Sequence, residues 1–159
     1  MTEIAFGKQA GLGSVHDPGL GHAARVLVVD DDANDRYLTI WNLGKAWPVR
    51  GELTAECAAD GAEALEKMRR HEYTLVVIDW NLPEKNGLAV LETMRGNGWN
   101  IPVVVVSGER RESMAGELQT MEATYVNKNE LNPTRLRKAI TASIQLQEPV
   151  RQAAAGSNT

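Results

Sequence analysis

Three short runs of β-branched and aliphatic residues constrain the fold of this chain more than any other feature. They lie at residues 26–29, 75–78 and 103–106, and no polar residue interrupts them. Continuous apolar runs of this length are typical of strands covered on both faces, as in a parallel sheet. The sequence therefore predicts three central strands of a parallel sheet.

Weaker strand patterns and helical patterns fill the intervals. Residues 53–57 alternate in the manner of an edge strand, and residues 124–127 are a fifth strand candidate. Apolar residues at helical spacing follow Asp60-Gly61 and Asn86-Gly87, and a final helix is predicted to open with Asn132 as its N-cap. Such alternation of strands and helices predicts a doubly wound α/β sheet.

The length and composition fit one domain with a looser segment at each end. The chain has 159 residues, 43% of them hydrophobic, and one domain usually holds about 100 to 150 residues. Residues 1–24 hold five glycines and no apolar periodicity, so we expect a flexible N-terminal arm. Residues 148–159 contain Pro149 and small residues, and we expect a flexible tail there. The folded domain is then predicted to cover residues 25–147.

Charge and hydropathy exclude several kinds of partner. The net charge of −4 argues against nucleic acid, because proteins that bind its phosphates usually carry a basic face. No apolar run approaches the roughly 18 residues that span a bilayer, so we expect no membrane partner and a cytoplasmic location. The single cysteine, Cys57, is predicted to be a buried, reduced thiol.

Polar residues follow directly after the predicted strands, where the functional residues of open α/β sheets gather. They are the acidic run Asp30–Asp32, then Asp79, Ser107 and Lys128. Carboxylates brought this close repel one another, and a hard divalent cation such as Mg²⁺ accepts oxygen ligands of this kind. A carboxylate, a hydroxyl and an ammonium beside such a cation suit phosphoryl transfer to an aspartate. Asp32 itself is predicted to be the N-cap of the next helix.

These segments resemble the receiver domain of bacterial two-component response regulators over nearly all of residues 25–147. The resemblance rests on VLVVDDD, VVIDWNLPEKNG, VVVVSG and YVNK, in the order in which the family has them. It implies a flavodoxin-like sheet of five parallel strands in the order 2-1-3-4-5, with helices on both faces. It also implies a response regulator that accepts a phosphoryl group from a sensor histidine kinase or a histidine phosphotransfer protein.

The expected output follows from the same resemblance. Because only residues 148–159 follow the predicted domain, we expect a single-domain regulator. Its output would be binding of a downstream protein, self-association as a homodimer, or phosphorelay. We expect no enzyme activity beyond its own phosphorylation and dephosphorylation.

The resemblance assigns Asp79 as the phospho-acceptor. Asp31 and Asp79 would hold the metal ion together with the backbone carbonyl of Asn81, and Asp30 would act on the ion largely through water. The expected ion is Mg²⁺, and Mn²⁺ is the alternative.

The remaining roles concern the phosphoryl group and its readout. Ser107 and Lys128 would bind the phosphoryl oxygens, and Tyr125 would act with Ser107 as the switch that is read on the fourth helix, fifth strand and fifth helix. Asn81 and Glu109 occupy the positions that tune dephosphorylation in the family. Their identities resemble the chemotaxis-type regulator, which implies a short-lived aspartyl phosphate.

Three alternatives stay open at the level of sequence. Lys128 is followed by Asn129 where most of the family has proline after a cis peptide bond. A non-prolyl cis bond would cost about 3 to 4 kcal/mol, so the loop either carries that cost or is trans. Asp30 and Asp32 also match the Asp-x-Asp of haloacid-dehalogenase-type phosphohydrolases, although the chain has no aspartate after Asp79. The third alternative is a pseudo-receiver that binds partners without phosphorylation.

Overall fold

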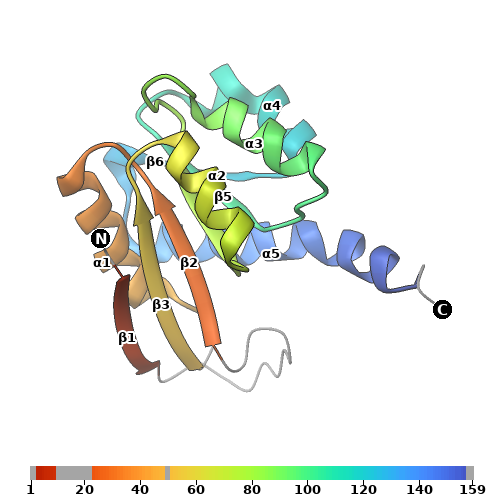
Figure 1. Ribbon diagram of the computed structural model, residues 1–159. Coiled ribbons are helices and arrows are strands. Elements are labelled where there is room, and N and C mark those ends of the chain that lie inside the picture. The colour runs from red at the N-terminus through yellow and green to blue at the C-terminus, as the bar shows by residue number, and fades with distance from the viewer. Residues whose placement is uncertain (1–2, 10–22, 49–50, 157–159) are drawn as a thin grey trace.

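The structure, a computed structural model, describes residues 3–9, 23–48 and 51–156, which form a six-stranded sheet flanked by helices (Figure 1). The strands are β1 (Glu3–Gln9), β2 (Ala23–Val29), β3 (Gly51–Ala58), β4 (Leu75–Asp79), β5 (Val103–Ser107) and β6 (Thr124–Asn127). The α-helices are α1 (Ala33–Ala46), α2 (Gly61–Arg70), α3 (Gly87–Gly96), α4 (Ala115–Met121) and α5 (Pro133–Gly156). Two short 3₁₀ helices, η1 (Arg111–Met114) and η2 (Lys128–Glu130), precede α4 and α5.

The parallel part of the sheet has the predicted topology. The order across the sheet is β1-β3-β2-β4-β5-β6, and the strands from β2 to β6 pair in parallel. Numbered along the chain without β1, these five strands lie in the order 2-1-3-4-5. The predicted flavodoxin-like arrangement is thereby confirmed.

The N-terminal segment differs from the prediction. Residues 3–9 were predicted to belong to a flexible arm, but they form β1, which pairs antiparallel with β3. The segment 53–57, predicted as an edge strand, therefore lies in an interior strand. An unpaired strand edge offers a row of backbone hydrogen-bonding groups, and β1 covers that row on β3. The glycine-rich stretch 10–22 of the predicted arm lies outside the described residues.

The C-terminal helix also differs from the prediction. α5 continues through Pro149 to Gly156 and extends past the sheet (Figure 1), whereas residues 148–159 were predicted to be a loose tail. The run Ala153–Ala155 favours the helical conformation, because alanine has the highest helix propensity. Residues 157–159 of the predicted tail are outside the described part.

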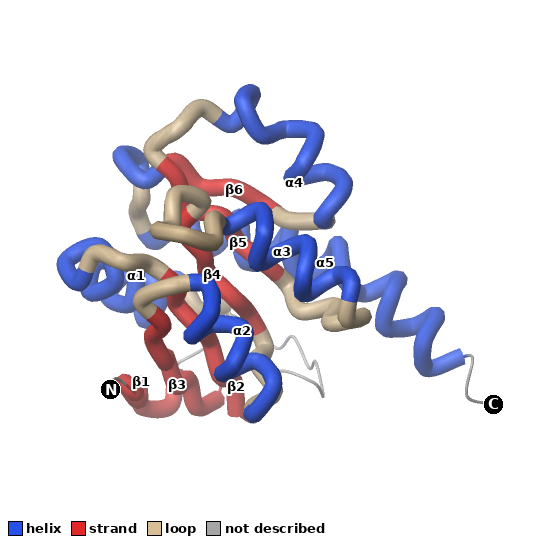
Figure 2. The backbone as a smooth tube through the Cα atoms, turned by 45° about the horizontal axis from the view of Figure 1, so that its top comes forward, coloured by secondary structure: helices blue, strands red, loops and turns tan. Residues whose placement is uncertain are grey.

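Helices lie on both faces of the sheet (Figure 2), and two apolar clusters of side chains pack them against it. On one face, Leu43 of α1 and Ile140 of α5 pack against the strands, and the predicted buried Cys57 belongs to this cluster. On the other face, Leu65 of α2 and Leu91 of α3 do the same, together with side chains of α4. Every residue of β4 and β5 is buried, which explains the uninterrupted apolar runs before Asp79 and Ser107.

Local capping signals set where the helices begin. The side chains of Asp32, Asp60, Asn86 and Asn132 each accept a hydrogen bond from the backbone N–H three residues later, at 2.8–3.0 Å. These are the positions that the sequence predicts as helix starts. None of the helices in the described ranges is both long and apolar enough to cross a bilayer.

Candidate functional site

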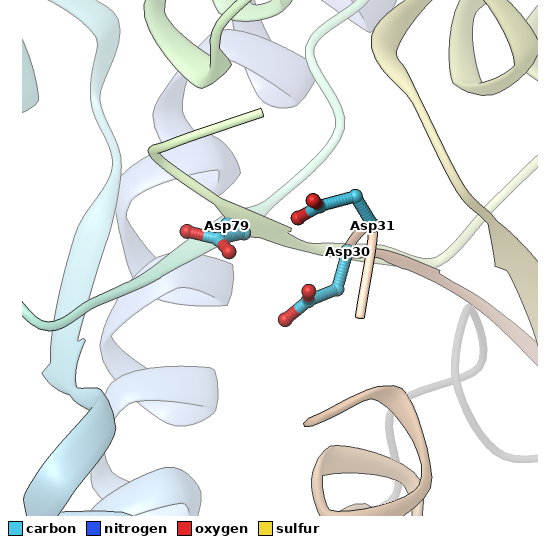
Figure 3. Close-up of side chains that lie close together, drawn as sticks. All are labelled: Asp30, Asp31 and Asp79. Atoms are coloured by element: carbon cyan, nitrogen blue, oxygen red, sulfur yellow. The ribbon is translucent and has the colours of Figure 1, made fainter. Parts of the chain in front are cut away.

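The carboxyl ends of four parallel strands bring the predicted site residues to one edge of the sheet. Asp79 is the last residue of β4 and Ser107 the last of β5, while Asp30 and Lys128 directly follow β2 and β6. Figure 3 shows Asp30, Asp31 and Asp79 beside one another at the ends of β2 and β4. Each of these three offers a carboxylate oxygen within 4.8 Å of the other two.

The same short turn fixes the side chain at three of these strand ends. Asp79 Oδ1 accepts a hydrogen bond from the backbone N–H of Asn81 at 3.0 Å. Asp30 Oδ1 and Ser107 Oγ each accept the corresponding bond, from the N–H two residues later, at 2.9 and 3.1 Å. Aspartate and serine favour such turns because their short side chains reach the backbone locally. Each turn fixes one side-chain oxygen, and the Oδ2 atoms of Asp30 and Asp79 both face Lys128.

Lys128 stands at the centre of the carboxylates. Its Nζ lies 2.7 Å from Asp35 Oδ2, 3.0 Å from Asp79 Oδ2 and 3.2 Å from Asp30 Oδ2. Partial burial by itself would lower the pKa of Lys128, but the hydrogen bonds to Asp35 and Asp79 and the charge of Asp30 outweigh it and raise that pKa. The Lys128-Asn129 peptide bond is trans. The ammonium therefore reaches Asp79 without the cis bond that is usual in the family.

The carboxylates exceed the cationic charge beside them. Asp30 and Asp79 are buried, with 3% and 6% of their surface exposed, whereas Asp31 is exposed. Burial raises the pKa of Asp30, the nearby charge of Asp79 raises it further, and the Asp32 N–H and Lys128 oppose this rise. A crowded, partly desolvated set of carboxylates of this kind favours a bound divalent cation.

Gly87 permits the close approach of α3 to the acceptor strand. A Cβ atom at this position would lie 2.8 Å from the carbonyl oxygen of Asp79 and 2.9 Å from the Cα of Trp80. The N–H of Gly87 donates to the carbonyl of Trp80 at 2.9 Å. Glycine is therefore required where the loop after Asp79 turns back to start α3.

The predicted switch residues lie next to one another on β5 and β6. The hydroxyl of Tyr125 donates to the carbonyl of Glu109 and lies 3.5 Å from the carbonyl oxygen of Ser107. The side chain of Ser107 is fully buried, and that of Glu109 is exposed. Tyr125 is thus hydrogen-bonded to the loop that begins with Ser107.

Two residues of the site were missed at the level of sequence. Asp35 makes the shortest ion pair of Lys128, and Arg36 donates from Nη1 to the carbonyl oxygen of Asp30 at 2.7 Å. The first turn of α1 carries both. No local pattern linked Asp35 to the site, because Asp31 precedes the N-cap Asp32 and helical spacing does not extend to it. Asp32, by contrast, caps α1 and lies outside the carboxylate cluster. This placement disfavours the alternative of a haloacid-dehalogenase-type phosphohydrolase, which would use Asp30 and Asp32 together.

Comparison with known proteins decides the family. The sequence model of the response regulator receiver domain matches residues 26–141. The chain belongs to this family. Receiver domains bind Mg²⁺ at an acidic pocket and interact with histidine kinases and downstream effectors, and the acidic pocket of this chain is the cluster of Asp30, Asp31 and Asp79.

Two curated relatives are longer proteins. A protein-glutamate methylesterase/protein-glutamine glutaminase of Treponema denticola is 35% identical over 98 residues, which are 62% of this chain and 26% of the relative. The response regulator MprA of Mycobacterium ulcerans is 32% identical over 101 residues, which are 64% of this chain and 40% of MprA. The chain thus matches less than half the length of either relative.

Solved structures share the fold over nearly their whole length. The response regulator TrrA of Thermotoga maritima, solved in complex with Mg²⁺ and BeF, is 25% identical with a TM-score of 0.64, and the match covers 76% of this chain and 98% of TrrA. The chemotaxis protein CheY4 of Vibrio cholerae is 27% identical with a TM-score of 0.63, covering 75% and 97%. These similarities agree with the parallel part of the sheet, β2 to β6.

Proposed function

We propose that this receiver domain accepts a phosphoryl group on Asp79 in a reaction that depends on Mg²⁺. The observation that carries the proposal is the contact of a buried strand-end carboxylate, Asp79, with Lys128 at 3.0 Å inside a cluster of three aspartates. The donor would be the phosphohistidine of a sensor kinase or of a phosphotransfer protein.

The carboxylate cluster fits a hard divalent cation. Asp30, Asp31 and Asp79 offer carboxylate oxygens within 4.8 Å of one another. Asp31, Asp79 and the backbone carbonyl of Asn81 would bind the ion directly, and Asp30 would act on it largely through water. Oxygen ligands suit Mg²⁺, with Mn²⁺ as the alternative. Such an ion would neutralise charge on the phosphoryl oxygens in the transition state.

The side chains around Asp79 have separate tasks in the transfer. A carboxylate oxygen of Asp79 would form the new O–P bond while the N–P bond of the phosphohistidine breaks and the electron pair stays on the imidazole. Lys128 would bind one phosphoryl oxygen through its ammonium, and the hydroxyl of Ser107 would donate to another. The hydrogen bond from the N–H of Asn81 holds the Asp79 carboxylate in a fixed orientation for this attack.

Readout of phosphorylation would pass through Ser107 and Tyr125. If Ser107 turns its hydroxyl toward the phosphoryl group, the bond from the Glu109 N–H to its Oγ breaks, and the loop to which Tyr125 is hydrogen-bonded must adjust. An open groove lined by α4, β6 and α5 adjoins Tyr125 and would present the change to a downstream protein.

Phosphorylation can be tested with acetyl phosphate and MgCl₂. Wild type should shift in a phosphate-affinity gel, and hydroxylamine, which cleaves acyl phosphates, should reverse the shift. Asp79→Asn should not shift, while Asp60→Asn, which alters a helix cap away from the cluster, should behave like wild type. A wild type that shows no shift and no added phosphoryl mass would overturn the proposal.

The lifetime of the phosphorylated state is a separate point. We propose that Asn81 and Glu109, two residues beyond Asp79 and Ser107, allow rapid hydrolysis. After removal of the donor, the shifted band should decay within minutes at room temperature. A band that outlasts an hour would contradict this part of the proposal and leave the role of Asp79 intact.

A further inference from the structure

Asp35 is the charged contact of Lys128 that the proposed chemistry does not use. It lies in the first turn of α1, and its carboxylate is 2.7 Å from Lys128 Nζ, closer than that of Asp79 or Asp30. The backbone of Asp35 is itself held, because its N–H donates to the capping side chain of Asp32 at 3.0 Å. A side chain on a fixed helical turn therefore meets the ammonium.

Asp35 differs in charge environment from the other two partners of Lys128. Asp30 and Asp79 belong to the carboxylate cluster that would bind the metal ion, whereas Asp35 stands outside that cluster in the described part of the chain. Its side chain is 37% exposed, so its carboxylate stays in contact with water at little cost of desolvation. When a cation engages Asp30 and Asp79, Asp35 keeps its charge available for Lys128.

The segment that carries Lys128 does little to restrict the position of its ammonium group. Lys128 begins η2, a single turn of three residues, and its four-carbon side chain has many rotamers. Besides Asp30 and Asp79, the first turn of α1 offers this side chain a contact through Asp35. That contact comes from outside the carboxylate cluster and can help to hold Nζ beside Asp79.

We propose that Asp35 is a positioning residue, whose carboxylate holds the Lys128 ammonium beside Asp79 and thereby speeds phosphoryl transfer. This inference rests on the proposed role of Asp79 as acceptor. Asp35 itself touches neither the phosphoryl group nor the metal ion, and its whole effect passes through Lys128.

The first experiment compares two variants that remove one negative charge from the same helical turn. Initial rates of phosphorylation by acetyl phosphate are measured at saturating MgCl₂ for wild type, Asp35→Asn and Asp32→Asn. Asn remains a good N-cap, so Asp32→Asn should keep the wild-type rate. Asp35→Asn should react about threefold more slowly, the size expected for a partly exposed ion pair. Asp35→Glu, which restores the charge, should recover part of the rate.

A double-mutant cycle shows whether Asp35 acts through Lys128. In a Lys128→Met background, followed over hours so that a low rate stays measurable, Asp35→Asn should cause no further loss. An equal loss in both backgrounds, an unchanged rate in Asp35→Asn, or a faster rate in that variant would each overturn the inference while leaving the role of Asp79 in place. A wild type that accepts no phosphoryl group would overturn both proposals.

Discussion

Among the residues that the structure describes, two clusters of charged groups on this sheet differ in their balance of charge. The carboxylate cluster of Asp30, Asp31 and Asp79 meets a single ammonium at the carboxyl ends of the strands. The second cluster, here called the Arg25 cluster, consists of Arg25 near the start of β2, Glu56 of β3 and Tyr73 just before β4. Both clusters contain buried carboxylates, namely Asp30 and Asp79 in the first and Glu56 in the second.

The Arg25 cluster satisfies its own charge. Arg25 Nη1 lies 2.7 Å from Glu56 Oε2, and the hydroxyl of Tyr73 donates to Glu56 Oε1 at 3.2 Å. One acid thus has one base and one hydroxyl as partners. Burial of Tyr73 raises its pKa, and the charge of Glu56 and the hydrogen bond to it raise it further.

The contrast indicates which cluster needs a ligand. Among the described side chains, the Arg25 cluster is neutral and contributes to the fold as it stands. The carboxylate cluster carries more negative charge than the Lys128 ammonium balances, and the raised pKa of Asp30 indicates that this excess charge opposes folding. The proposed cation binding and phosphoryl transfer therefore belong to the unbalanced cluster.

The largest expected difference between the clusters is in affinity for Mg²⁺. Asp30→Asn and Asp31→Asn should each weaken Mg²⁺ binding at least tenfold, about 1.4 kcal/mol, because each removes a negative charge from the metal site. Glu56→Gln removes a buried charge from the balanced cluster and should leave the affinity unchanged. Isothermal titration with MgCl₂ measures all three. Equal losses in the two clusters would break the contrast.

A smaller difference, of opposite sign in the two clusters, is expected in stability without metal. The raised pKa of Asp30 means that its ionised form opposes folding at neutral pH, so Asp30→Asn should raise the free energy of unfolding by about 1 kcal/mol in EDTA. Glu56→Gln should lower it by about 1 kcal/mol, because Arg25 loses its ion pair. Urea unfolding monitored by circular dichroism gives both values. A loss of stability in Asp30→Asn would contradict the idea that the site is strained by its charge.

Adding MgCl₂ should then remove the stability advantage of Asp30→Asn over wild type. A ligand that binds only the folded state stabilises it by about 1.4 kcal/mol at ten times its dissociation constant. Wild type should gain this amount and Asp30→Asn much less. The same urea titrations with and without MgCl₂ measure the gain.

The smallest effect concerns the pH dependence of the Arg25 cluster. Because the pKa of Tyr73 is raised in the folded state, the unfolded chain loses this proton first as pH rises toward 10. Wild type should therefore lose about 0.4 kcal/mol of stability between pH 8 and pH 10 relative to Tyr73→Phe. Parallel stability curves for the two proteins over this range would show that Tyr73 titrates normally.

Much of the fold and the proposed site could be predicted because their signals are local. Each apolar run identifies a buried strand by its own composition, and each cap, such as Asp60, needs only the next three residues. The acidic residues follow their strands directly, so parallel topology alone places Asp30 near Asp79. The roles of Ser107, Lys128 and Tyr125 remain predictions, although the structure brings these side chains to the expected edge.

The predictions that were wrong or incomplete concern β1, the end of α5 and Asp35, where the local pattern was absent or misleading. β1 depends on the free edge of β3, a segment distant along the chain, and the glycine content of residues 1–24 gave no sign of that pairing. Pro149 indicated the end of α5, yet the helix continues because the alanines after it favour helix. The sequence around Asp35 shows only an acidic residue in a first helical turn, because its partner Lys128 lies far along the chain.

The sequence by itself determined the alternation of strands and helices, the family, and the acidic residues at the strand ends, because neighbouring residues set periodicity, caps and strand composition. Only the tertiary structure decided that a sixth strand covers the edge, that the loop after Lys128 is trans, and that Asp35 shares the ammonium of Lys128. Each of these features depends on groups that are distant in the chain and close in space. Contacts between such groups leave no pattern among neighbouring residues of the sequence.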